Sequence, residues 1–153
     1  MQLIRALATV RITGALPALR RLEPVKMTRH QWQELVDHAR EDAPNECCGW
    51  VRGRDGSVVE VHRSENERAS PYGYSLDPKS LLAAFNAAED ADEVGIYHSH
   101  PRSPAEPSQT DINLAEYPEY TYLIVSLADD EAPEVRAWRI AGGKADEERI
   151  EVA

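Results

Sequence analysis

The sequence contains little cysteine and no long apolar run. Only two of its 153 residues are cysteines, and these are adjacent, at Cys47 and Cys48. Neighbouring cysteines rarely meet disulfide geometry, so we expect a chain without disulfides in the reducing cytoplasm. No apolar stretch approaches the roughly 20 residues that span a bilayer. The sequence therefore predicts no transmembrane helix and no membrane partner.

Basic residues are also few relative to acidic ones, with 17 Lys and Arg against 27 Asp and Glu, and the formal net charge at pH 7 is −10. Nucleic-acid binding depends on clustered Lys and Arg side chains that neutralise phosphates, so this charge argues against a nucleic-acid partner. The remaining composition, 42% hydrophobic and 29% charged, is typical of a globular protein. A chain of this length without internal repeats is expected to form one domain.

The N-terminal segment, residues 1–26, contains arginine and few acids and is interrupted by Gly14 and Pro17. It lacks the continuous apolar segment and cleavage site of a secretory signal, although its composition loosely resembles a transit peptide. Two interpretations stay open: a disordered appended leader, or a start codon assigned too early, with Met27 as the natural beginning. We therefore expect a leader outside the domain and a single domain over residues 27–153.

Residue patterns after Met27 predict a mixture of helices and strands. Thr28 and Gln31 have capping-box spacing at the start of a helix that extends to about Glu41. Asp77 and Pro78 are a suitable N-cap and first residue for a second helix. Strands are predicted near 45–51, 58–62, 94–97, 122–127, 135–140 and in one final strand ending near 152, with a short helix over 108–116. This order predicts an α/β fold, a curved mixed sheet flanked by helices.

A cluster of possible metal ligands follows the apolar run that ends at Tyr97. His98 and His100 are two residues apart, and strand side chains alternate faces, so both imidazoles should project from one side of a sheet. A Pro-rich loop can return Asp111 to this pair if a helix begins near Ser108 or Thr110. Two nitrogens and one oxygen suit Zn²⁺ and leave one tetrahedral position open, as in catalytic sites.

Each of these residues also has an ordinary structural interpretation. A His-x-His pair occurs by chance on many strands, and Ser108 and Asp111 have the spacing of a helix cap. Glu46 alone would be interpreted as a surface carboxylate. Their joint occurrence at fixed spacing nevertheless favours a metal site, because several independent accidents would have to coincide.

The other histidines and the cysteines are assigned no chemistry. His30, His38 and His62 are expected to be solvated, and a buried thiol is expected for at least one of Cys47 and Cys48. A zinc deaminase would need His-x-Glu and Pro-Cys-x-x-Cys, and the sequence contains neither.

The spacing of these residues resembles that of a known family. His-Ser-His-Pro, six residues, Ser, two residues and Asp, with an upstream Glu, is similar to the pattern of the JAMM (MPN+) zinc metalloproteases. The matching residues are Glu46, His98, Ser99, His100, Pro101, Ser108 and Asp111. Segments 46–49, 74–77 and 89–93 further resemble the small bacterial Mec branch. The resemblance covers about residues 27–150 and implies a single MPN domain of the cytidine-deaminase-like type.

The resemblance implies a role for each matched residue. His98, His100 and Asp111 would hold one Zn²⁺ per chain. Glu46 would not bind the metal but would act as general base and acid, accepting a proton from water and passing it to the leaving amine. Ser108 would donate a hydrogen bond to the oxyanion formed at the amide carbonyl.

The implied function is that of a cytoplasmic zinc-dependent isopeptidase or peptidase. Its partner would be a ubiquitin-like sulfur-carrier protein ending in Gly-Gly, from which it would release cysteine or trim C-terminal residues. The extended tail could lie beside a sheet edge, where a narrow groove admits only glycine. The alternative is a non-catalytic module that binds a ubiquitin-like partner, and the oligomeric state stays open.

Overall fold

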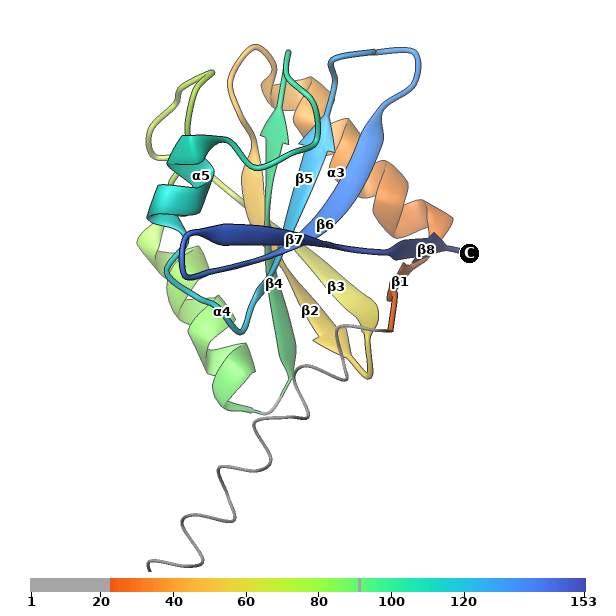
Figure 1. The fold of residues 1–153 in the computed structure, drawn as a ribbon, viewed down its shortest axis with the longest axis vertical. Coiled ribbons are helices and arrows are strands. Elements are labelled where there is room, and N and C mark those ends of the chain that lie inside the picture. The colour runs from red at the N-terminus through yellow and green to blue at the C-terminus, as the bar shows by residue number, and fades with distance from the viewer. Residues whose placement is uncertain (1–22, 91) are drawn as a thin grey trace, which may run out of the picture.

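The computed structural model describes residues 23–90 and 92–153, in which eight strands form one curved mixed sheet and three helices pack against it (Figure 1). The elements are β1 (Val25–Met27), α3 (Arg29–Asp42), β2 (Cys48–Arg54), β3 (Ser57–Ser64), α4 (Pro78–Glu89), β4 (Glu93–His100), α5 (Gln109–Leu114), β5 (Thr121–Ser126), β6 (Glu134–Ala141), β7 (Lys144–Glu148) and β8 (Ile150–Val152). The α/β class expected from the order of elements is confirmed. No helix in the described part of the chain is long and apolar enough to cross a membrane.

The sheet has the strand order β7-β6-β5-β4-β2-β3-β1-β8. The central strand β4 runs antiparallel to β2 and parallel to β5. The consecutive strands β7 and β8 lie at opposite ends of this order, and Figure 1 shows β7 continuing across the sheet into β8. Only Arg149 separates them, and one residue advances a strand by only about 3.3 Å, so the sheet must curve until its two edges approach each other.

The expectation of a single C-terminal strand is therefore wrong. Two strands replace it, because the chain leaves β6 after Glu148 and pairs with β1 from Ile150 onward. The change of partner depends on the curvature of the whole sheet, and the residue pattern of one strand carries no sign of it.

Local signals at the helix starts are confirmed. The Thr28 hydroxyl accepts a hydrogen bond from the Gln31 amide at 3.1 Å, and the Gln31 side chain accepts one from the Thr28 amide at 2.9 Å. This is a capping box, which satisfies amides that the first helical turn leaves unpaired. Asp77 caps α4 in a similar way, accepting from the Ser80 amide at 2.8 Å.

Two apolar layers cover the two faces of the sheet. On one face, Leu35, Val36 and Ala39 of α3 pack against strand residues such as Tyr97 and Val125. On the opposite face, α4 packs against a second set of buried side chains, Trp50, Ala84, Ala87, Ile96, Tyr122, Ile124 and Trp138. Because side chains alternate along β4, residues 96, 98 and 100 face the α4 side, and residues 97 and 99 face the α3 side.

Two expectations about individual residues need correction. His38 is buried rather than solvated, because its Nδ1 lies 2.7 Å from the buried Tyr97 hydroxyl and its Nε2 lies 3.4 Å from Asp42. A buried phenol requires a polar partner, and the sequence separation of the pair concealed this one. His62 is half-buried, because its ring stacks on Trp50 at a centroid distance of 4.2 Å. His30 is exposed, as expected.

The expected domain start at Met27 falls inside β1. Val25 pairs with Ile150, and Lys26 pairs with both Ser57 and Glu151, so these two residues belong to the sheet. A three-residue strand carries too little pattern to be recognised without its partners. Residues 1–22 of the expected leader lie outside the described residues.

Candidate metal centre

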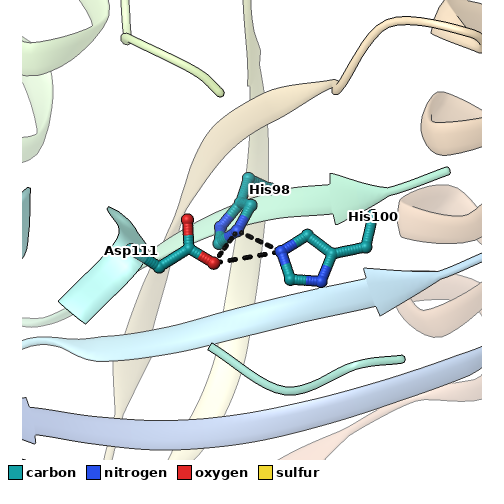
Figure 2. Close-up of side chains that lie close together, drawn as sticks. All are labelled: His98, His100 and Asp111. Atoms are coloured by element: carbon teal, nitrogen blue, oxygen red, sulfur yellow. Dashed lines mark hydrogen bonds and ion pairs between the residues drawn. The ribbon is translucent and has the colours of Figure 1, made fainter. Parts of the chain in front are cut away.

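Strand β4 and helix α5 bring three side chains to one point on the α4 side of the sheet (Figure 2). The Nε2 atoms of His98 and His100 lie 3.1 Å apart. The Oδ2 atom of Asp111 lies 3.2 Å from Nε2 of His98 and 3.0 Å from Nε2 of His100. The expectation that the loop returns Asp111 to the histidine pair is met by these distances.

The spacing of these atoms fits a small tetrahedral metal ion. Ligand atoms at about 2.0 to 2.2 Å from zinc stand about 3.3 to 3.5 Å from one another, so the observed triangle needs to open only slightly. The side chains of His98, His100 and Asp111 are 1%, 5% and 8% exposed. Among the described residues this is the only cluster of three or more His, Cys, Asp or Glu side chains with such spacing.

Neighbouring groups orient the three side chains. Nδ1 of His100 donates to the Pro104 carbonyl at 2.8 Å, which assigns the ring proton to Nδ1 and leaves Nε2 free to bind a cation. Oδ2 of Asp111 accepts from the Ser108 amide at 2.9 Å. The His98 ring stacks on Tyr74 at 4.3 Å with an interplanar angle of 16°. Stacking orients this ring, because its Nδ1 has no hydrogen-bond partner within the described chain.

The loop between the ligands is fixed at several points. The Ser126 hydroxyl donates to the Ser103 carbonyl at 2.6 Å, and the Trp138 indole donates to the Ala105 carbonyl at 2.9 Å. At the end of the loop the Ser108 hydroxyl accepts from the Asp111 amide at 3.0 Å, forming a second capping box. These contacts hold α5 and its ligand without help from a metal. The interpretation of Ser108 and Asp111 as a helix cap is therefore correct and compatible with a metal site.

The electrostatics of the centre favour a bound cation. Burial lowers the pKa of His98, which keeps its ring neutral. Burial also acts to lower the pKa of His100, but its hydrogen bonds with Asp111 and the Pro104 carbonyl raise the pKa overall. For Asp111, burial is outweighed by the hydrogen bonds with His100 and His98, so its pKa falls below the ordinary value. An ionised carboxylate beside two imidazoles is a suitable ligand set for a divalent ion.

Glu46 lies beside this centre and is not a surface carboxylate. It is 5% exposed, and its Oε1 atom is buried with no hydrogen-bond partner among the described residues. Burial raises the pKa of this carboxyl to about 7, and the negative charge of Asp111 adds to the rise, whereas His100 opposes it. Buried polar atoms are normally paired, so the free oxygen indicates a carboxylate directed at a group outside the chain.

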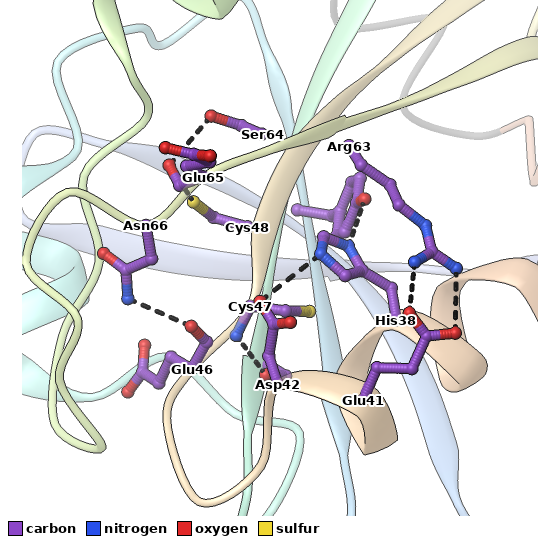
Figure 3. A network of polar contacts seen from close by, with 12 residues as sticks. His38, Glu41, Asp42, Glu46, Cys47, Cys48, Arg63, Ser64, Glu65 and Asn66 are labelled. Atoms are coloured by element: carbon purple, nitrogen blue, oxygen red, sulfur yellow. Dashed lines mark hydrogen bonds and ion pairs between the residues drawn. The ribbon is translucent and has the colours of Figure 1, made fainter.

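The segment that carries Glu46 is tied to β4 and to the loop after β3. The Ser99 hydroxyl accepts from the Cys47 amide at 2.8 Å, and the Ser99 amide donates to the Cys47 carbonyl at 3.1 Å. The Asn66 side chain donates to the Glu46 carbonyl at 3.0 Å (Figure 3). Glu46 also donates its amide to Ser70 at 2.9 Å. The contact between Cys47 and Ser99, which are 52 positions apart in the sequence, thus joins the segment that carries Glu46 to the strand that carries the two histidines.

Sequence reasoning missed the supporting residues Asn66, Tyr74 and Ser99. Ser99 was part of the recognised pattern but had no role assigned, and its place between two ligands was the only signal available. Tyr74 belongs to the segment 74–77 that resembles the Mec branch, but no role was assigned to it either. Asn66 lies in an irregular loop where no periodicity applies. Both thiols are buried, and burial raises the pKa of Cys47 and Cys48 to about 12. Neutral thiols outside the cluster are not metal ligands, as expected for buried cysteine.

Fold and site together define a class of protein: an α/β domain with a cluster of two histidines and one carboxylate that could hold a metal ion and an adjacent buried carboxyl, as in metal-dependent hydrolases. Residues 28–141 match the Prok-JAB family, described as prokaryotic homologs of the JAB domain. The chain belongs to this family. The resemblance inferred from residue spacing is thereby confirmed, together with the fold that it implied.

Individual relatives agree with this assignment. The chain is 43% identical to the CysO-cysteine peptidase of Mycobacterium tuberculosis over 122 residues, which is 77% of this chain and 84% of that protein. It is 42% identical to the desampylase of Haloferax volcanii over 101 residues, covering 60% of this chain and 73% of the relative. The solution structure of protein DSY2949 from Desulfitobacterium hafniense is 37% identical, with a TM-score of 0.74, and the match covers 84% of this chain and 92% of that one.

Proposed function

We propose that this protein is a zinc-dependent peptidase that hydrolyses the amide bond after the C-terminal Gly-Gly of a ubiquitin-like sulfur-carrier protein. The reaction releases cysteine or trims other C-terminal residues from the carrier. The observation that carries the proposal is the convergence of three ligand atoms within 3.2 Å beside the unpaired buried oxygen of Glu46. Its similarity to a CysO-cysteine peptidase and to a desampylase supports this class of substrate.

In this proposal one zinc ion per chain is held by His98, His100 and Asp111. Zinc held there would act as a Lewis acid and would lower the pKa of water to about 7. The chain supplies the remaining functions. The Pro104 carbonyl and the Ser108 amide keep His100 and Asp111 in position by hydrogen bonds to the ligand side chains.

Glu46 is the proton carrier. A general base works best when its pKa lies near the working pH, and burial raises the pKa of this carboxyl to about 7. Its carboxylate takes a proton from the attacking water and then gives it to the nitrogen of the leaving amine. The hydrogen bonds of Asn66 and Ser70 to the Glu46 backbone hold the carboxyl at the centre during both transfers.

Ser108 provides the hydrogen bond to the oxyanion. Its hydroxyl oxygen accepts from the Asp111 amide, and a hydroxyl keeps one proton to donate after accepting a bond. Within the described chain that proton has no acceptor, so it is available to the oxygen of the scissile carbonyl. The same residue thus caps α5 through one atom and contacts the substrate through another.

The partner is an extended protein tail rather than a nucleic acid, and the reaction takes place in the cytoplasm. A net charge of −10 repels phosphates, and two free buried thiols are compatible with a reducing compartment. Glycine at both positions before the cleaved bond lets the tail approach the centre closely, since no side chain intervenes.

A cleavage assay with metal analysis tests the proposal. The substrate is a ubiquitin-like protein ending in Gly-Gly with cysteine joined to it by a peptide bond. The masses of the products are measured by mass spectrometry. We expect one zinc per chain, cleavage after the second glycine, loss of cleavage with a chelator and recovery with added zinc. Tight binding of the substrate by the zinc-loaded protein without any cleavage would instead identify a non-catalytic binding module.

A further inference from the structure

A small pocket adjoins the metal centre on the side of Asp111. Its volume is about 160 Å³, and it is formed by the loop after β3 together with residues of α4, β4, α5 and β5. Apolar side chains such as Leu76, Leu114 and Tyr117 form its walls, whereas Arg68 contributes a positive charge. A pocket of this volume has room for a single small amino-acid residue and not for a protein surface.

Arg68 has no partner for its charge within the described chain. Its backbone amide donates to the Asn66 side chain at 3.0 Å, but no hydrogen bond or ion pair in the described chain engages the guanidinium. The side chain is exposed and lies close enough to Glu46 for its charge to oppose the rise in that carboxyl's pKa. An unpaired cation is thus held beside the centre in a protein whose net charge is −10.

The position of the guanidinium is set by a glycine. A Cβ atom added to Gly73 would lie 2.7 Å from Nη1 and 2.8 Å from Cζ of Arg68, so the guanidinium rests directly on the Gly73 backbone. Asn66 holds both parts of this contact, because its side chain accepts from the Arg68 amide and donates to the Gly73 carbonyl at 3.0 Å. The Asn66 amide group also binds the Glu46 carbonyl. One side chain therefore ties Arg68 and the general base together.

We propose that Arg68 binds the free α-carboxylate of the residue that is released, so that the enzyme prefers a single amino acid joined to the carrier over a lysine side chain of a folded protein. The inference rests on the proposed function, since it assigns the leaving group of that reaction. The leaving nitrogen must reach the metal centre, and the adjoining pocket has room for one residue. A guanidinium is the side chain best suited to a carboxylate, because it donates two parallel hydrogen bonds.

Arg68 takes no part in the bond changes. One water is consumed, the amide C–N bond breaks, the carbonyl carbon gains the water oxygen, and the leaving nitrogen gains a proton. The products are a carrier with a terminal glycine carboxylate and an amino acid that keeps its original carboxylate. Arg68 contacts the carboxylate of the released amino acid and so determines specificity. Its replacement should therefore slow cleavage only of substrates that carry this carboxylate.

Two substrates that differ in one group test the proposal. Both are the same ubiquitin-like protein ending in Gly-Gly-Cys, one with a free terminal carboxylate and the other with a carboxamide. For the wild-type protein we expect kcat/KM to be about tenfold higher, or more, for the carboxylate, as for a hydrogen bond to a charged group. Arg68→Gln should bring this ratio close to one, and Arg68→Lys should restore only part of it.

Gly73→Ala provides a second variant that keeps the charge. The new methyl group would displace the guanidinium while Arg68 stays in the chain, so the preference for the carboxylate should fall as in Arg68→Gln. Lys79→Gln is the matched control, because it removes one exposed positive charge from a residue that does not line this pocket. Its ratio should equal that of the wild type. Thermal melting of each variant verifies that it is folded.

The outcomes separate this inference from the proposed function. Efficient wild-type cleavage of both substrates at equal rates would overturn the role of Arg68 and leave the peptidase assignment in place. An unchanged ratio in Arg68→Gln, with kcat/KM reduced for both substrates, would show that Arg68 binds the carrier instead. Failure of the zinc-loaded wild type to cleave either substrate would refute the proposed function itself, and this inference with it.

Discussion

The two faces of strand β4 perform different tasks with alternate residues. On the α4 side, His98 and His100 aim ring nitrogens at one point, and Nδ1 of His98 has no partner in the described chain. On the α3 side, Tyr97 and Ser99 are fully buried and hydrogen-bonded, to His38 and Cys47 respectively. The reactive face depends on the packed one, because Ser99 also anchors the segment that carries Glu46.

Unsatisfied polar atoms are concentrated on the reactive face. Three buried side-chain atoms lack a hydrogen-bond partner in the described chain; one of them, Nδ1 of His98, belongs to the candidate metal centre, and another, Oε1 of Glu46, lies beside it. A buried polar atom that stays unpaired costs about 1 to 3 kcal/mol of stability. The packed face therefore contributes stability that offsets the cost of unpaired polar groups on the face that carries the ligands.

Removing a ligand from the reactive face should have the largest effect. We expect His100→Ala to weaken zinc binding by more than about 100-fold and to abolish cleavage, while the fold is retained because Ser108 caps α5 independently. Competition with a zinc chelator measures the affinity, and circular dichroism checks the fold. The exposed His30→Ala is the matched control and should bind zinc normally. Equal zinc affinity in both variants would remove His100 from the site.

Removing the proposed oxyanion donor should also lower turnover strongly. Ser108→Ala should lower kcat by about 10² to 10³-fold, as is typical for the loss of one such donor. Zinc content should stay at the wild-type level, because the Ser108 backbone amide still binds Asp111. Ser108→Thr keeps the hydroxyl and should retain most of the activity. A kcat for Ser108→Ala within a few-fold of wild type would limit Ser108 to its capping role.

The raised pKa of Glu46 predicts a pH dependence of stability in the metal-free protein. Between about pH 4.5 and pH 7 the folded chain keeps a proton that the unfolded chain has already released. The contribution of Glu46 to wild-type stability should therefore decline across this window, whereas the side chain of Glu46→Gln does not titrate and makes no such contribution. The difference in unfolding free energy should shift in favour of the variant by as much as about 3 kcal/mol, as measured by urea unfolding. Parallel pH profiles would contradict the raised pKa.

Breaking the packed face should give the smallest effect on metal binding. Ser99→Ala leaves the Cys47 amide without its partner and should cost about 1 to 2 kcal/mol of stability. Cleavage should fall because Glu46 is displaced, with zinc affinity near that of the wild type. The exposed Ser103→Ala is the control for the serine substitution. Denaturant unfolding and zinc competition on the same samples separate the effect on stability from the effect on zinc, and loss of zinc affinity in Ser99→Ala would show that Ser99 also supports the ligands.

Features that depend on residues close in the sequence could be predicted, and features that depend on distant residues could not. The helix caps at Thr28 and Asp77 and the spacing of His98, His100 and Asp111 depend on residues near one another in the chain, and the structure agrees with each. Strand β1, the division of β7 from β8 and the burial of His38 depend on partners far away in the sequence. No local pattern could show them.

Glu46 was predictable only through the family resemblance. It lies 52 residues before its nearest ligand in the chain, and alone it would be interpreted as a surface carboxylate. Its approach to the centre results from the pairing of β2 with β4, in which Cys48 lies opposite His98. Arg68 and Asn66 belong to an irregular loop, and the family resemblance indicated no role for either residue.

The central claim is that a buried carboxyl and a metal centre share one water. The most direct measurement is turnover of the carrier–cysteine conjugate by Glu46→Gln, with the zinc content of the same sample determined. Gln keeps the size of the side chain but cannot accept a proton, and general acid/base contributions are typically about 10² to 10⁴-fold. The account predicts a loss of this size with zinc unchanged. Turnover near the wild-type rate would contradict it, because the centre would then work without this base.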